Sequence, residues 1–267
     1  MPRFGDGQIK LDFDSEKYKR ASSQQKAWGR KLIVELDLRG DERILDLGCG
    51  DGALTAELAE LVTDGSVLGI DSSVSMIETA RKDCSSKNLR FELQDIEKID
   101  FESEFDLVFS NAALHWVKDH RRLLANVHRS LKDRGVARFQ FAGDGNCSNL
   151  IAVLQETISQ KDYAGYFEDF QWPWYMPVVE QYRKLLDDAA FGEKRLWHQS
   201  ADKHFESVEA MVRWIDQPSI VPFLRDVNEK DRQRFRDAVV ERMIERTRQS
   251  DGTCFETFCR INVLARK

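Results

Sequence analysis

The sequence of 267 residues lacks any run of 18 apolar residues, and its first residues lack the hydrophobic core of a secretion signal. We therefore expect a protein that neither spans a membrane nor is secreted. Internal repeats and low-complexity tracts are also absent. Hydrophobic residues make up 42% of the chain, enough for one sizeable core and a smaller attached lobe.

Paired cysteines and an excess of basic residues are missing as well. The five cysteines form no CxxC pair and are odd in number, which indicates reduced thiols and a cytoplasmic protein. A formal net charge of −6 argues against nucleic acid as a partner, because phosphate binding depends on clustered lysine and arginine. Basic residues at 232–236 and 242–248 alternate with acidic ones, as on a solvated helix face. We expect a monomer or a homodimer.

Residues 42–52, Glu-Arg-Ile-Leu-Asp-Leu-Gly-Cys-Gly-Asp-Gly, are the most informative segment. Their apolar residues predict a short buried strand. Gly48, Gly50 and Gly52 then allow a tight turn that approaches a ligand closely, and the following helix directs its free N–H groups at that turn. Asp71 ends a second apolar run about 20 residues later, where a carboxylate meets a ribose diol. The pattern predicts a nucleoside-binding corner.

Two ligand classes fit this corner. The sequence from Gly48 to Ala53 satisfies the G-x-G-x-x-G/A fingerprint of dinucleotide sites, so a nicotinamide cofactor is one alternative. Asp46 and Asp51 favour the other, because a pyrophosphate would meet like charge there. S-adenosylmethionine has no phosphate and carries an ammonium and a sulfonium that these carboxylates attract. A structural turn without a ligand is the third interpretation.

Four segments resemble the successive motifs of class I S-adenosylmethionine-dependent methyltransferases in order and spacing: residues 44–52, 69–71, 94–96 and 105–111. The resemblance covers roughly residues 15–141. It implies that Asp71 binds the ribose hydroxyls, that Asp95 and Ile96 bind the adenine edge, and that the Gly48 turn binds the methionine moiety. The further cofactor contacts that we expect are Tyr18, Ser22, Asp46, Cys49, Gly50, Ser72, Met76 and Asn111.

A narrower resemblance concerns the methyl acceptor. Residues 111–119, Asn-Ala-Ala-Leu-His-Trp-Val-Lys-Asp, are similar to a segment of trans-aconitate, juvenile hormone acid and malonyl-carrier-protein methyltransferases, all of which esterify carboxylic acids. Residues 17–26 and 259–267 look most like the juvenile hormone acid enzymes, whereas residues 221–224 look more like the trans-aconitate enzymes. Residues 217–220 depart from the threonine-containing stretch of that family. The resemblance therefore implies acid esterification without identifying the acid.

Alternating strands and helices predict an α/β fold, a Rossmann-like sheet with helices on both faces. The resemblance implies seven strands with the last one antiparallel. Strands are expected near residues 43–47, 66–70, 89–93, 105–109, 135–142, 194–200 and 253–265. Helices are expected near residues 15–37, 52–62, 73–84, 119–131, 206–216 and 228–248. Gly135 is expected to form a turn after the fourth helix.

The chain also predicts two domains. Residues 1–142, 193–202 and 251–267 would form the cofactor-binding core, and residues 143–192 and 203–250 a mainly helical cap. Aromatic residues concentrate in the cap, either as an ordinary small core or as a wall for an organic acid with an apolar body. The substrate-binding candidates are Tyr166, Trp172, Trp174, Tyr175 and Arg260. Arg260 would pair with a distal carboxylate, or else form a surface ion pair.

Esterification asks little of the protein, because a carboxylate with a pKa near 4 is already ionised at neutral pH and needs no general base. No metal ion is expected. By resemblance to the juvenile hormone acid enzymes, Gln25 and Trp116 would donate hydrogen bonds that align the carboxylate. His115 would serve as the base in an alternative N-, C- or phenolic O-methylation. A cofactor-binding module without catalysis is the alternative from another class.

Overall fold

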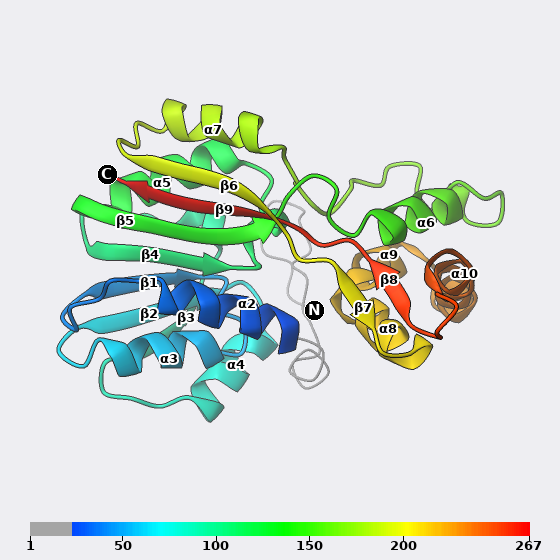
Figure 1. Cartoon of the computed structure of the whole chain (residues 1–267), viewed down its shortest axis with the longest axis horizontal. Helices are drawn as coiled ribbons and strands as arrows, with labels where there is room; N and C mark the ends of the chain where they lie inside the picture. The colour runs from blue at the N-terminus through cyan, green and yellow to red at the C-terminus, as the bar shows by residue number, and fades with distance from the viewer. Residues whose placement is uncertain (1–22) are drawn as a thin grey trace. The chain divides into compact units, whose positions relative to one another are not determined.

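The computed structural model describes residues 23–267, which form two compact units (Figure 1). The sheet unit comprises the described residues up to Phe141, together with Arg183–Leu196 and Val263–Lys267, and the helical unit comprises Ala142–Tyr182 and Trp197–Asn262. Residues 183–192 thus group with the sheet, whereas the sequence analysis placed them in the cap. The roles assigned to the two domains, cofactor binding for the core and substrate binding for the cap, remain a prediction.

A seven-stranded sheet organises the first unit, in the order β3-β2-β1-β4-β5-β9-β6. Its strands are β1 (Arg43–Leu47), β2 (Ser66–Asp71), β3 (Leu89–Leu93), β4 (Phe105–Asn111), β5 (Leu131–Ala142), β6 (Lys194–Ser200) and β9 (Cys259–Arg266). β1 to β5 pair in parallel, and β9 points the opposite way in Figure 1. This confirms the predicted fold class.

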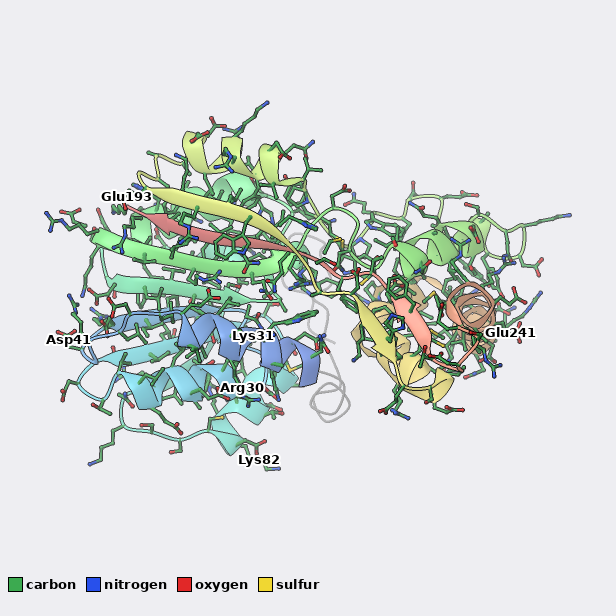
Figure 2. The ribbon with its side chains drawn as sticks, viewed as in Figure 1. Arg30, Lys31, Asp41, Lys82, Glu193 and Glu241 are labelled. Carbon is green, nitrogen blue, oxygen red and sulfur yellow. The ribbon has the colours of Figure 1, made fainter. Side chains whose placement is uncertain are left out.

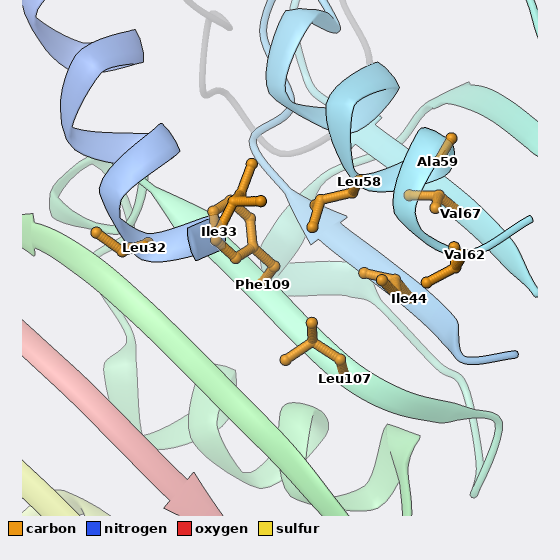
Figure 3. Close-up of a cluster of buried hydrophobic side chains, with 9 residues drawn as sticks. All are labelled: Leu32, Ile33, Ile44, Leu58, Ala59, Val62, Val67, Leu107 and Phe109. Atoms are coloured by element: carbon orange, nitrogen blue, oxygen red, sulfur yellow. The ribbon is translucent and has the colours of Figure 1, made fainter. Parts of the chain in front are cut away.

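The core of the sheet unit lies where two helices cover the central strands (Figure 3). The helices are α2 (Ser23–Val34) and α3 (Ala53–Leu61), which lie in front of the sheet in Figure 1. The buried side chains of this cluster are Leu32, Ile33, Ile44, Leu58, Ala59, Val62, Val67, Leu107 and Phe109. Parallel strands buried on both faces require such continuous apolar runs, which explains the sequence of β1.

Local capping sets where two further helices begin. Ser73 precedes α4 (Val74–Asp83), and its hydroxyl accepts a hydrogen bond from the Met76 N–H. Asp119 precedes α5 (His120–Ser130), and its carboxylate accepts one from the Arg122 N–H at 2.9 Å. Each cap satisfies an N–H that the first helical turn leaves without a partner. A further helix, α7, spans Val179–Asp188.

The helical unit has its own apolar interior. Its elements are α6 (Ser148–Ile158), β7 (Lys203–Phe205), α8 (Val208–Trp214), a π-helical turn (Ile215–Ser219), α9 (Val221–Asp226), α10 (Glu229–Thr247) and β8 (Cys254–Glu256). Phe223 and Phe235 have no exposed surface, and the rings of Tyr163 and Phe235 meet edge to face at 5.1 Å. Within residues 23–267, no helix has the length and apolar character to cross a bilayer.

Three details of the predicted secondary structure are wrong. Gly135 lies within β5, and the irregularity there is a bulge next to Arg134, whose φ is 64°. The segment expected as one strand over residues 253–265 forms β8 and β9, and β8 pairs antiparallel with β7 in a separate sheet. The sequence analysis also missed α6, α7 and α9. The expected helix over residues 15–37 is described only from Ser23, as α2.

Truncating Leu58 to alanine tests the core. Leu58 is completely buried in α3, so the cavity left by Leu58→Ala should lower the free energy of unfolding by about 2–5 kcal/mol. Leu61 ends the same helix with 49% of its surface exposed, and Leu61→Ala should cost less than about 1 kcal/mol. Urea denaturation followed by circular dichroism measures both, and equal costs would contradict this account of the core.

Candidate functional site

The glycine turn after β1 is held against the end of β2. The N–H groups of Gly48 and Cys49 donate to the Ile70 carbonyl at 2.9 and 3.0 Å. The Gly50 N–H donates to one carboxylate oxygen of Asp71 at 3.0 Å, and the other oxygen accepts the Ser73 N–H at 2.9 Å. The structure therefore brings Asp71 to the turn, as its spacing predicts, and fixes the orientation of its carboxylate.

Two of the glycines are required by the protein's own packing. Gly48 and Gly52 have φ values of 74° and 78°, in the region that disfavours other residues. A Cβ on Gly48 would lie 2.3 Å from the Cβ of Ala113, and one on Gly52 would lie 2.7 Å from the ring of Phe91. Close approach between protein segments, and not only approach to a ligand, thus explains these glycines.

A pocket of about 410 Å³, part of it open to solvent, lies between the glycine turn and α2. Its lining residues are Gln25, Lys26, Asp46, Gly48, Cys49, Gly50, Asp51, Leu54 and Asn111. Asp46 is only 3% exposed, and the Thr55 hydroxyl donates to its carboxylate at 2.7 Å. Burial raises the pKa of Asp46 to about 7, against the effect of the Thr55 hydrogen bond and with a contribution from the charge of Asp71.

Lys26 is a pocket residue that the sequence analysis missed. Its ammonium donates to Asp51 at 2.5 Å, and the two side chains are 18% and 7% exposed. The charge of Asp51, which the sequence analysis assigned to attracting the cofactor's cations, is therefore paired within the protein. The available signal was the spacing of Lys26 three residues before Gly29 and seven before Ile33, which places it on the side of α2 that faces the protein.

Gln25 and Asn111 present oxygen acceptors in the same pocket. The side-chain amide of Asn111 donates to the Gln25 backbone carbonyl at 2.9 Å. The side-chain oxygens of both residues are buried, and no group within residues 23–267 donates a hydrogen bond to them. Buried acceptors of this kind require donors. Together with Asp46 they fit a cationic ammonium with several N–H groups, such as the one in the amino-acid end of S-adenosylmethionine.

The adenine candidates follow β3 and lie close to the turn. The Gln94 N–H donates to the Asp71 carbonyl at 3.0 Å, so this loop is tied to the end of β2. Asp95 accepts a hydrogen bond from the Glu97 N–H at 3.1 Å, and the end of the Ile96 side chain lies beside Gly48. Both residues are half-buried. The structure thus gathers the predicted ribose and adenine residues at one edge of the sheet.

Other predicted cofactor residues differ in their environments. Ser72 is half-buried, whereas Met76 is 2% exposed and belongs to the interior face of α4. Cys49 packs with Ile77, Ala80 and Phe91, and burial raises the pKa of its thiol well above the usual value, with Asp71 and Asp46 adding to the shift. Tyr18 and Ser22 lie outside the described residues.

The candidate catalytic residues His115 and Trp116 follow β4 in a short 3₁₀ helix, Leu114–Trp116. Both side chains are half-buried, and their rings lie 5.4 Å apart. A second histidine, His120, lies close to this segment in the sequence. Burial lowers the pKa of His120 to about 4, and its ring nitrogen bonds the Leu114 carbonyl at 3.0 Å. His120 is thus a structural residue beneath this segment.

The substrate candidates belong to the helical unit. The Tyr166 hydroxyl donates to Asp231 at 2.6 Å, and the rings of Trp172 and Trp174 meet edge to face at 5.7 Å. Tyr175 is half-buried. Arg260 is 3% exposed, so its interpretation as a surface ion-pair residue is wrong. Nowhere in residues 23–267 do three or more His, Cys, Asp or Glu side chains gather to hold a metal ion.

Comparisons with known proteins identify the class of this fold and site. Residues 44–135 match a family model described as a methyltransferase domain. Trans-aconitate 2-methyltransferase from Deinococcus radiodurans is 29% identical over 230 residues, which cover 85% of this chain and 88% of that protein. The enzyme of the same name from Escherichia coli is 26% identical over 257 residues, covering 96% and 98%.

Solved structures share the fold. An S-adenosylmethionine-dependent methyltransferase from Mesorhizobium loti superposes with a TM-score of 0.53 at 20% identity, covering 89% of this chain and 96% of that one. Phosphoethanolamine N-methyltransferase 2 from Haemonchus contortus, in complex with S-adenosyl-L-methionine, gives a TM-score of 0.59 at 16% identity over 94% of this chain, which spans 56% of that longer protein.

The matched methyltransferase domain and the near full-length likeness to methyltransferases identify the kind of enzyme, and the solved structures show the same fold. The chain is an S-adenosylmethionine-dependent enzyme, and the nicotinamide alternative and the module without catalysis are not supported. When bound, the cofactor supplies a methyl group on a sulfonium. Asp46, Gln25 and Asn111 present the acceptors that would hold its ammonium, and Asp71 would meet its ribose, as the resemblance implies.

The pKa of Asp46 predicts a pH-dependent stability. Its folded pKa of about 7 exceeds the unfolded value of about 3.9, so ionisation opposes folding, and stability falls as the pH rises from about 4 to 7. The asparagine of Asp46→Asn cannot ionise, so this variant should avoid the loss of folding stability. That loss amounts to up to about 4 kcal/mol for a shift of about three pKa units. Urea denaturation of cofactor-free protein between pH 5 and 8 measures the difference.

Asp106 serves as a control, because its pKa is shifted in the direction opposite to that of Asp46. Partial burial acts to raise the pKa of Asp106, but hydrogen bonds from Lys132 and the Arg43 N–H outweigh it and lower the pKa. Asp106→Asn should therefore lose stability at neutral pH and match the wild type in acid. If wild type and Asp46→Asn had parallel stability profiles between pH 5 and 8, the assignment of the raised pKa to Asp46 would be wrong.

Proposed function

We propose that the enzyme transfers the methyl group to a carboxylate of a small organic acid, giving a methyl ester and S-adenosylhomocysteine. The observation that carries the proposal is the similarity, over nearly the whole chain, to enzymes named for methylating trans-aconitate. The His115-Trp116 segment, which also resembles other acid methyltransferases, agrees with it. A cytoplasmic location agrees with the five cysteines, all of which are free thiols.

Methylation of a carboxylate requires a site that aligns the acceptor oxygen with the methyl group, and it does not require a general base. An ordinary carboxylic acid with a pKa near 4 is ionised at neutral pH, so its oxygen is already the nucleophile. We propose that the indole N–H of Trp116 and the side-chain amide of Gln25 donate hydrogen bonds that orient this oxygen. Such donors reduce the freedom of the reacting group and replace part of its hydration.

The helical unit is proposed to contact the body of the acid. Trp172, Trp174 and Tyr175 offer apolar aromatic surface, whereas the Tyr166 hydroxyl is engaged with Asp231 inside the unit. Arg260 is proposed to bind a second carboxylate of a dicarboxylic or tricarboxylic acid. Its support is a guanidinium that is 3% exposed, because arginine pairs with carboxylates through two parallel hydrogen bonds and such pairs are strong when shielded from water.

A turnover assay with methyl-tritiated S-adenosylmethionine tests the reaction class. Pools of aliphatic, aromatic and polycarboxylic acids are incubated with the enzyme, treated with mild base and assayed for volatile tritiated methanol. Methyl esters release the label under these conditions, and splitting the active pool identifies the acid. Label that stays with amines or phenols after base treatment would overturn the carboxylate assignment and favour His115 as a general base.

Two substitutions separate alignment from base catalysis. Trp116→Phe keeps an aromatic ring but removes the N–H donor, so kcat/KM should fall about 10- to 100-fold, the effect of one hydrogen bond to a charged group. His115→Ala should change kcat less than about fivefold and leave a flat pH–rate profile between pH 6 and 9. Cofactor affinity, measured by calorimetry, should be unchanged in both. The reverse pattern of losses would contradict this mechanism.

A further inference from the structure

Lys26 contributes a positive charge to a pocket that otherwise displays acids. It lines the same pocket as Asp46 and Asp51, and its side chain is 18% exposed. Two carboxylates that are 3% and 6% exposed make this pocket unfavourable for an incoming anion. The Lys26 ammonium, which α2 contributes to the pocket, offsets part of this negative charge.

The amino-acid end of the cofactor carries one carboxylate and one ammonium, and the pocket has a partner for each. The ammonium is matched by oxygen acceptors, namely Asp46 and the buried side-chain oxygens of Gln25 and Asn111. The carboxylate needs donors, preferably cationic ones. Among the side chains of Gln25, Lys26, Asp46, Asp51, Leu54 and Asn111 that line the pocket, the one cation is Lys26.

Lys26 also has donors to spare. An ammonium has three N–H groups, and within residues 23–267 Lys26 uses one of them in a side-chain hydrogen bond, the bond to Asp51. Asp51 does not depend on Lys26 alone, because its other oxygen accepts the Ala53 N–H at 3.4 Å, at the start of α3. The first turn of a helix stabilises a nearby anion. Lys26 is therefore able to bind a second anion while Asp51 keeps a partner.

We propose that Lys26 binds the α-carboxylate of S-adenosylmethionine while Asp46, Gln25 and Asn111 hold its ammonium. In this proposal the first turns of α2, together with the glycine turn, recognise the amino-acid end of the cofactor. Lys26 acts in binding and not in the methyl transfer. The proposal concerns the cofactor alone and stands independently of which acid, or which other acceptor, the enzyme methylates.

Calorimetric binding of two ligands to the full chain tests the proposal. S-adenosylmethionine has the carboxylate, and decarboxylated S-adenosylmethionine lacks it while keeping the sulfonium and the amine. Lys26→Met should weaken binding of the first at least tenfold and change binding of the second less than about threefold. Equal weakening for the two ligands, or unchanged binding of both, would overturn the proposal.

The matched control lies on the same helix. Arg30, which is labelled in Figure 2, forms an ion pair with Glu57 between α2 and α3 at 2.7 Å. It is exposed and does not line the pocket. Arg30→Met removes a cation from α2 just as Lys26→Met does. It should leave the affinities for both ligands within about twofold. A loss equal to that of Lys26→Met would assign the effect to the overall charge of the helix, contrary to the proposal.

A double variant distinguishes carboxylate binding from neutralisation of Asp51. If Lys26 served only to balance Asp51, then Lys26→Met combined with Asp51→Asn would restore wild-type affinity for S-adenosylmethionine. We expect the double variant to remain at least tenfold weaker. Lys26→Arg retains the charge and should keep a preference for the carboxylate ligand, which excludes a folding defect as the cause. Thermal melting of each variant without ligand records the structural cost separately.

Discussion

The parallel pairing of β1 with β2 and β4 is the constraint on which the site depends. Because these strands run in the same direction, their carboxyl ends meet at one edge of the sheet. The glycine turn leaves β1 there, Asp71 ends β2 there, and Asn111 ends β4 there. Backbone bonds from the turn to Ile70 then fix the distances between segments that are far apart in sequence.

Charge is the second organising principle of the site. A buried carboxylate is tolerated only when it is neutral, hydrogen-bonded or paired. The Asp46 carboxylate accepts a hydrogen bond from the Thr55 hydroxyl and has a raised pKa. Asp51 forms an ion pair with Lys26. The pocket thus contains charged groups with which the ammonium and the carboxylate of a zwitterionic ligand can form new ion pairs. Affinity and stability are coupled through these few groups.

The sequence predicted the parts of the molecule that local signals define. The apolar run of β1, the glycines after it and the carboxylate at the end of β2 are all readable within about 30 residues, and each lies where expected. The break between β8 and β9 was missed because the partner of β8 is β7, about 50 residues earlier in the chain.

Pairings over long sequence distances also explain what the site analysis missed. Lys26 and Asp51 are 25 positions apart, and no periodicity connects a residue of one helix to a glycine turn. Gly135 was misassigned for a different reason. A glycine shortly after a helix is typical of a helix end, yet the residue with positive φ is the preceding Arg134. Such a bulge follows from the pairing of β5 with β4, which the sequence does not display.

The position of β9 has a consequence for the order in which the protein can assemble. β9 is the last strand within residues 23–267, yet it lies between β5 and β6 in the sheet. During synthesis, β5 and β6 therefore wait on the ribosome with unpaired edges until residues 259–266 emerge. Exposed strand edges recruit other chains. A nascent chain stalled before this segment emerges would be a substrate for chaperones, because the sheet is completed only after this segment has left the ribosome.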